Sequence, residues 1–139
     1  MFDIIKTILE VGKSLFGLRA EFEKISRDRR DRLVQYFSDI ATLLEEVSAL
    51  LRTGEYPHGK CAELGALADL MPQTLAGLLP DEDIQTNKDK LRAAHEVELL
   101  YSQLDPLMSE ESQKRLVELD EAAGQFRALV AHLRVTSSD

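Results

Sequence analysis

The chain has 139 residues, a formal net charge of −8, 44% hydrophobic residues and 6% aromatic residues, with no Trp. Seven Gly and four Pro are too few for the many turns of a β-sandwich or barrel, and the hydrophobic content excludes wholesale disorder. The acidic balance argues against nucleic-acid binding, and the single Cys cannot form an internal disulfide.

The first predicted helix runs from Phe2 to about Ser26. Two apolar stripes with helical spacing lie side by side along it and make a wide apolar face over its first four turns. The face contains Phe2, Ile4, Ile5, Ile8, Leu9, Val11, Leu15 and Phe16. Either neighbouring helices cover this face inside a bundle, or the face is released and inserts at a bilayer interface.

A charged run, Arg27–Arg32, follows and contains no apolar residue, so it predicts a connection at which the apolar face shifts. Its four arginines are Arg27, Arg29, Arg30 and Arg32. They either form local ion pairs in solvent or contact anionic lipid headgroups or an acidic partner. Residues 1–32 carry eight basic and six acidic groups, whereas residues 33–139 carry nine and nineteen. Attraction to an anionic membrane would therefore come from the N-terminal end.

The second and third predicted helices follow the charged run. The apolar stripe resumes at Leu33 and ends at Thr53-Gly54, a pair typical of a helix C-terminus. The third helix is predicted from Cys61 to about Leu79. It is expected to be kinked or split at Pro72, because an interior proline removes one backbone hydrogen bond and clashes with the preceding turn.

The last two predicted helices run from about Glu82 to Leu104 and onward from Ser109, whose side chain can cap a helix. No segment alternates with the two-residue period of a strand. The chain is therefore predicted to be an all-α, up-down bundle of four to five amphipathic helices over residues 1–134, with a short polar tail at 135–139. The predicted core contains Leu33, Phe37, Ile40, Leu44, Leu64, Leu91, Leu116, Leu119 and Phe126.

The sequence carries no recognisable catalytic motif. It has no glycine-rich phosphate loop, no nucleophile elbow and no zinc-binding His pair at helical spacing. His58 and Cys61 have the spacing of half a metal site, but two ligands cannot fill four zinc positions. We therefore expect no enzyme activity, no metal and no cofactor.

The order of these features resembles that of the HeLo, HeLo-like and Bell domains, which are helical bundles of cell-death pathways. The resemblance rests on the apolar stretch Met1–Gly12 at the N-terminus, followed by the basic break Arg27–Arg32, a long second helix and a kinked third helix. It is a resemblance of layout and covers most of the chain. The stretch Gly54–Leu64 is also similar to segments in helical domains of cyanobacterial proteins.

This resemblance implies a membrane-permeabilising cell-death executioner of a bacterial, NLR-like immune pathway. Such domains rest in the cytoplasm until an upstream receptor makes them self-associate, and the N-terminal helix then inserts at the inner face of the plasma membrane. The apolar face of the first helix would enter anionic lipid, and the four arginines would contact headgroups. No amyloid-forming motif follows Arg134, which departs from those families. The alternative is a soluble adaptor or regulatory bundle that acts through protein–protein contacts.

Overall fold

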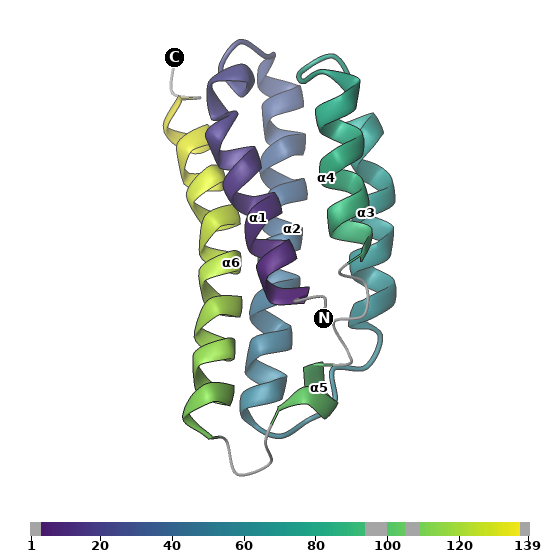
Figure 1. Ribbon diagram of the computed structural model, residues 1–139. Coiled ribbons are helices and arrows are strands. Elements are labelled where there is room, and N and C mark those ends of the chain that lie inside the picture. The colour runs from purple at the N-terminus through teal and green to yellow at the C-terminus, as the bar shows by residue number, and fades with distance from the viewer. Residues whose placement is uncertain (1–3, 94–99, 105–108, 137–139) are drawn as a thin grey trace.

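In the computed structural model, residues 4–93, 100–104 and 109–136 are described, and they form α-helices and one short 3₁₀-helix (Figure 1). The elements are α1 (Ile4–Gly17), η1 (Arg19–Phe22), α2 (Arg27–Arg52), α3 (Lys60–Leu75), α4 (Asp81–Ala93), α5 (Leu100–Gln103) and α6 (Glu110–Thr136). The described residues contain no strand, so the prediction of an all-α bundle is confirmed.

The five longer helices form a ring around one core. α1 packs against α6, α6 against α2, α2 against α3, α3 against α4, and α4 packs back against α1. The short helix α5 lies at one end of the bundle (Figure 1). All nine residues predicted for the core are buried in this one cluster. The ring therefore covers each helix on two sides and leaves its third side exposed.

The boundary between the first two predicted helices is different in the structure. α1 ends at Gly17, the 3₁₀ turn η1 follows, and α2 begins at Arg27, so the charged run forms the first turns of α2 and is not a connection. Ser26 is the N-cap of α2, and its Oγ accepts a hydrogen bond from the backbone N–H of Arg29 at 3.3 Å. Asp28 in the first turn complements the helix dipole. The run lacks apolar residues because these turns face solvent and other polar groups.

Helix α3 passes through Pro72 and ends at Leu75, so it is not split at this proline and the predicted end at Leu79 is wrong, whereas the alternative of a kink stays a prediction. Gly77, with a φ of 78°, turns the chain just beyond the helix. The guanidinium of Arg29 donates hydrogen bonds to the backbone carbonyls of Thr74 and Ala76 at this end. The last carbonyl groups of a helix have no backbone N–H of the same helix to bond to, and here a side chain from α2 supplies the donor.

The C-terminal half follows the prediction more closely. The predicted fourth helix corresponds to α4 and α5, and residues 94–99 between them lie outside the described residues. Ser109 caps α6 as predicted, since its Oγ accepts a hydrogen bond from the backbone N–H of Ser112 at 3.3 Å. Helix α6 extends to Thr136, which is two residues into the predicted polar tail. Residues 137–139 lie outside the described residues.

Candidate functional site

The apolar face predicted for the first helix is turned into the bundle. Its residues in the core are Ile5, Ile8, Val11 and Leu15, each at most 1% exposed. Leu9 and Phe16 are partly buried against the same core. Phe2 and the side chain of Ile4 lie outside the described residues. The face is wide because two neighbours, α6 and α4, cover α1 from different sides.

Gly12 allows α1 to approach α6 closely. A Cβ atom on Gly12 would lie 2.9 Å from Cβ of Gln125 and 3.4 Å from Cε2 of Phe126. Real Cβ atoms essentially never come within 3.0 Å of another heavy atom, so the two helices could not keep this distance with a larger residue. The hydrogen atom of glycine therefore sets the spacing between α1 and α6.

Polar contacts lie on the outer surface of α1 and at its C-terminal end. Glu10 Oε2 is 3.7 Å from Lys90 Nζ of α4, and both side chains are well exposed, so this ion pair contributes little to stability. Arg19 donates a hydrogen bond to the carbonyl of Phe16 at 3.0 Å, and its guanidinium lies 4.4 Å from the centre of the Phe16 ring. Leu18, between α1 and η1, is not helical. Helix α1 is thus a separate unit joined to α2 through a turn.

The four arginines of the charged run divide into two pairs. Arg29 binds the end of α3, as described above, and Arg30, only 9% exposed, donates to the carbonyl of Glu23 at 2.8 Å. Both side chains therefore hold the fold together. Arg27 and Arg32 are exposed and can reach an external anion. The sequence did not separate these pairs, because the difference lies in the carbonyl groups that the fold brings to them.

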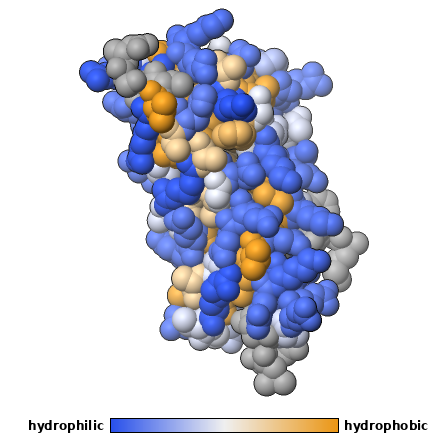
Figure 2. Space-filling view, turned by 90° about the vertical axis from the view of Figure 1, so that its left-hand side faces the viewer, coloured by the Kyte–Doolittle hydropathy of each residue, from blue (hydrophilic) through white to orange (hydrophobic). Residues whose placement is uncertain are grey.

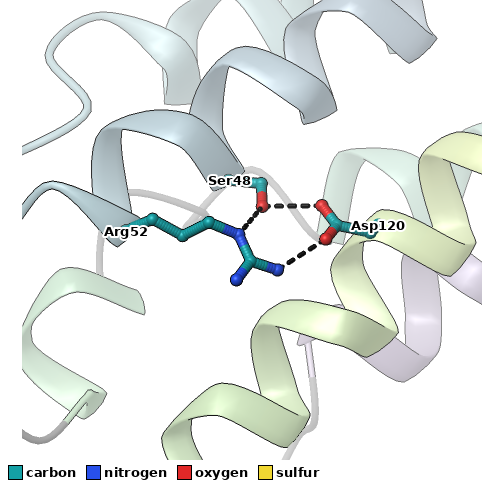
Figure 3. A network of polar contacts seen from close by, with 3 residues as sticks. All are labelled: Ser48, Arg52 and Asp120. Atoms are coloured by element: carbon teal, nitrogen blue, oxygen red, sulfur yellow. Dashed lines mark hydrogen bonds and ion pairs between the residues drawn. The ribbon is translucent and has the colours of Figure 1, made fainter. Parts of the chain in front are cut away.

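Two polar clusters join α2 to α6, and sequence reasoning missed both. Figure 3 shows the first, in which Ser48 Oγ donates to Asp120 Oδ1 at 2.7 Å and Arg52 Nη2 lies 2.6 Å from Asp120 Oδ2. The second cluster lies seven residues away along each helix, where Arg127 Nη2 is 2.6 Å from Glu45 Oε1. This hydrogen bond raises the pKa of Arg127. Glu45 and Arg52 are seven residues apart in the sequence, and so are Asp120 and Arg127. This equal spacing of opposite charges was the signal from which the pairing of the two helices could have been predicted. These contacts fix the register of the two helices.

Shallow hollows lie on both flanks of α3. The hollow toward α4 is lined by Cys61, Ala62, Gly65, Ala66, Asp69, Asp89 and Arg92. On the other flank, two adjoining hollows between α2 and α3 share Asp39 and Leu67, and together they form one open groove. Leu70, on the rim of this groove, is 45% exposed. By contrast, Figure 2 faces α6 and shows a mostly hydrophilic surface with separate hydrophobic patches.

The described part of the chain offers no cluster of three or more His, Cys, Asp and Glu that could hold a metal ion. His58 is exposed and packs edge-on against Tyr56 with 4.7 Å between ring centres, whereas Cys61 is half-buried at the start of α3. Within the same residues, no helix has both the length and the apolar character to cross a bilayer.

No family model, curated protein or solved structure matches this chain. The likeness to HeLo and Bell domains, which rests on the order of features in the sequence, therefore stays a prediction.

Proposed function

We propose that this chain is a non-enzymatic, membrane-targeting bundle of a bacterial cell-death pathway, in which α1 enters the membrane after self-association. The observation that carries the proposal is α1 itself, the most apolar of the longer helices, which ends at a non-helical residue. A helix with one strongly apolar face is the kind that lies at a membrane interface. The resemblance in layout to HeLo and Bell domains supports the same assignment.

The core sets the cost of releasing α1. Release exposes four core side chains at about 1.5–3 kcal/mol each, or about 6–12 kcal/mol together. Transfer of the same face into lipid regains burial of a similar size. The remaining cost is the core surface of α4 and α6 that α1 leaves uncovered, and self-association can lower this cost by covering that surface. At low concentration we expect α1 to stay in the bundle.

Positive charge near α1 favours contact with an anionic membrane. Arg27 and Arg32 are exposed, and so are Lys6 and Lys13 on the outer face of α1. Each basic residue close to an anionic surface contributes about 1 kcal/mol of attraction. The remaining chain, residues 33–139, is strongly acidic and is repelled by the same surface. This charge distribution orients the N-terminal end toward the inner face of the plasma membrane when an upstream receptor brings copies together.

A reversible tether tests the release of α1. In a Cys61→Ser background, Glu10→Cys and Lys90→Cys place thiols on α1 and α4 at the site of an ion pair. A bismaleimide that contains a disulfide then joins the two helices. Protein oligomerised through a fused assembly module should release dye from anionic vesicles when untethered, fail when tethered and recover after reduction. The matched control joins α3 to α4 at Asp69 and Arg92 and should leave leakage unchanged.

Failure of the untethered, oligomerised protein to bind or permeabilise vesicles of any charge would overturn the membrane proposal. The second candidate, a soluble adaptor or regulatory bundle, would then take its place. Two observations favour that candidate: the core residues of α1 are fully buried, and grooves along α3 offer surface for a protein partner.

A further inference from the structure

The groove between α2 and α3 plays no part in the proposed release of α1. In the ring of helices, this seam lies across the bundle from α1. Its apolar lining consists of Tyr36 and Leu43 from α2 and Ala66, Leu67 and Leu70 from α3. Ala62, Ala66 and Leu70 follow each other at four-residue spacing on the exposed side of α3. The groove thus has an apolar floor beside an exposed apolar ridge.

Charged side chains give the groove two different ends. Arg32 lies at the end where α2 begins, Asp39 lies in the middle where the two hollows meet, and Glu46 and Glu63 line the end where α3 begins. Lys60 Nζ lies 2.5 Å from Glu46 and 3.2 Å from Glu63, which offsets part of the negative charge. The side chains of Glu46 and Glu63 are still 50% and 57% exposed, and these two carboxylates outnumber the one ammonium group. One end is therefore basic and the other acidic.

We propose that this groove binds an amphipathic helix of a partner protein that is acidic in its first turns and basic in its last turns. Its apolar stripe would pack against Leu67 and Leu70, the usual way in which a helix occupies an apolar groove. Its acidic end would meet Arg32 and its basic end Glu63. The helix would therefore run parallel to α2 and antiparallel to α3. The helix dipole favours this charge order, so a helix can carry it readily.

The size of the groove sets the length of the partner. From Arg32 to Glu46, α2 covers about 21 Å at a rise of 1.5 Å per residue. A partner helix of about four turns spans this distance. Its apolar anchors would recur at positions three and four residues apart, because only that spacing keeps them on one face.

Two synthetic peptides of about four turns test the proposal. Both contain the same leucine stripe and the same numbers of Glu and Lys, and a hydrocarbon staple on the outer face keeps both helical. One has Glu in its first turns and Lys in its last turns, and the other has the reverse order. Fluorescence anisotropy should give a dissociation constant at least about ten-fold lower for the first peptide. Because composition and net charge are identical, the ratio reports the order of charges in the groove.

Variants of the full chain locate the binding site. Leu70→Asp should abolish binding, whereas Val117→Asp, at a residue of α6 that is 50% exposed, should leave it unchanged. Arg32→Glu combined with Glu63→Lys should reverse the preference between the two peptides. Thermal unfolding of each variant shows whether the fold is intact. All four substituted positions are exposed, so we expect unfolding midpoints close to that of the parent chain.

Equal affinity for the two peptides, or binding that survives Leu70→Asp, would overturn the proposal. A second copy of the chain is the other possible occupant. If analytical ultracentrifugation finds a dimer that Leu70→Asp dissociates, and the two peptides bind with equal affinity, the occupant of the groove is a second copy of the chain and not a partner helix. Peptide binding does not depend on vesicle leakage, so this proposal and the membrane proposal can fail separately.

Discussion

The two sides of this bundle are packed in different ways. On one side, η1, α2 and α6 meet through large rings: Phe37 of α2 lies 5.9 Å from Phe22 of η1 and 6.5 Å from Phe126 of α6 between ring centres, and Gly12 brings α1 close to α6. On the other side, α3 and α4 have 16 and 13 residues, against 26 and 27 in α2 and α6, and hollows flank α3. The two longest helices, α2 and α6, therefore lie on the packed side, whereas the α3–α4 hairpin keeps exposed surface for contacts.

The hairpin is fixed by polar contacts to its backbone. Arg29 binds carbonyl groups at the end of α3, and the hydroxyl of Tyr36 donates to the carbonyl of Leu67. The latter bond lies next to the carbonyl of Ala68. This carbonyl receives no hydrogen bond from residue 72, because proline has no backbone N–H. These hydrogen bonds act together with side-chain packing, because Leu64, Met71 and Leu75 of α3 are fully buried in the core.

The largest expected effect comes from the ring contacts on the packed side. Phe126→Ala should lower the free energy of unfolding by about 3–5 kcal/mol, because it removes a fully buried ring and leaves a cavity. Leu70→Ala on the hairpin side should change it by less than about 0.5 kcal/mol, since that side chain is half exposed. Urea unfolding followed by circular dichroism measures both, and losses of similar size would contradict the contrast between the two sides.

The packed side is also the side that the sequence predicts best. The stripe from Leu116 to Leu133 keeps helical spacing over five turns, and every member of it is buried. The burial of the face of α1 was one of two open alternatives, because its width fits a helix with two neighbours as well as one in lipid. Periodicity identifies which residues are buried, but it does not show whether neighbouring helices or lipid covers them.

The start of α2 shows where the prediction fails. An apolar stripe reports only the buried face of a helix, so the exposed turns of Arg27–Arg32 had the pattern of a connection. The cap at Ser26 was the local signal that a helix begins there. The structural role of Arg29 could not be predicted, because its acceptors lie 45 and 47 residues away along the chain. Such a contact exists only after α2 and α3 have packed.

Removal of Arg29 tests how the hairpin is held. Arg29→Ala should lower the free energy of unfolding by about 1.5–3 kcal/mol, the usual range for hydrogen bonds of a charged group. Arg27→Ala, at an exposed position of the same turn, should change it by less than about 0.5 kcal/mol. Hydrogen exchange should show the loss of protection concentrated at the end of α3. Equal effects of the two substitutions would mean that Arg29 does not anchor α3, and that its charge can be reversed as freely as that of Arg27.

The close approach of α1 to α6 is tested with two glycines. Gly12→Ala should lower the free energy of unfolding by about 1–3 kcal/mol, because the new methyl group meets Gln125 Cβ at 2.9 Å and the helices must move apart. Gly124→Ala in α6 has no heavy atom within 4 Å of the new Cβ and should stabilise the chain by about 0.5–1 kcal/mol. Denaturant unfolding of both variants gives the two signs. Stabilisation by Gly12→Ala would show that α1 packs loosely.

The pH dependence of stability tests the contact of Tyr36 with α3. Burial raises the pKa of Tyr36 above its ordinary value of 10.0. Above pH 10 the unfolded chain loses this proton while the folded chain keeps it, so stability falls as the pH rises, by about 1.4 kcal/mol per pH unit. The pKa of Lys60 is raised by its hydrogen bond to Glu46, and this contribution is also lost as the pH rises. Tyr36→Phe should remove one proton from the slope of stability against pH. A slope unchanged by Tyr36→Phe would mean that this ring is open to solvent.

The smallest expected effect compares one exposed ion pair from each side. Arg52–Asp120 joins α2 to α6 and Arg92–Asp69 joins α3 to α4, both at 2.6 Å and both about half exposed, so each should couple by no more than about 1 kcal/mol. The first pair should be the stronger, because Ser48, only 3% exposed, also donates to Asp120 and holds its carboxylate in place before the arginine binds. Double-mutant cycles measure both couplings, and Ser48→Ala should reduce the first toward the second. Equal couplings in the parent chain would show that orientation of Asp120 by Ser48 adds nothing, and that the seven-residue register of α2 and α6 rests on their apolar contacts.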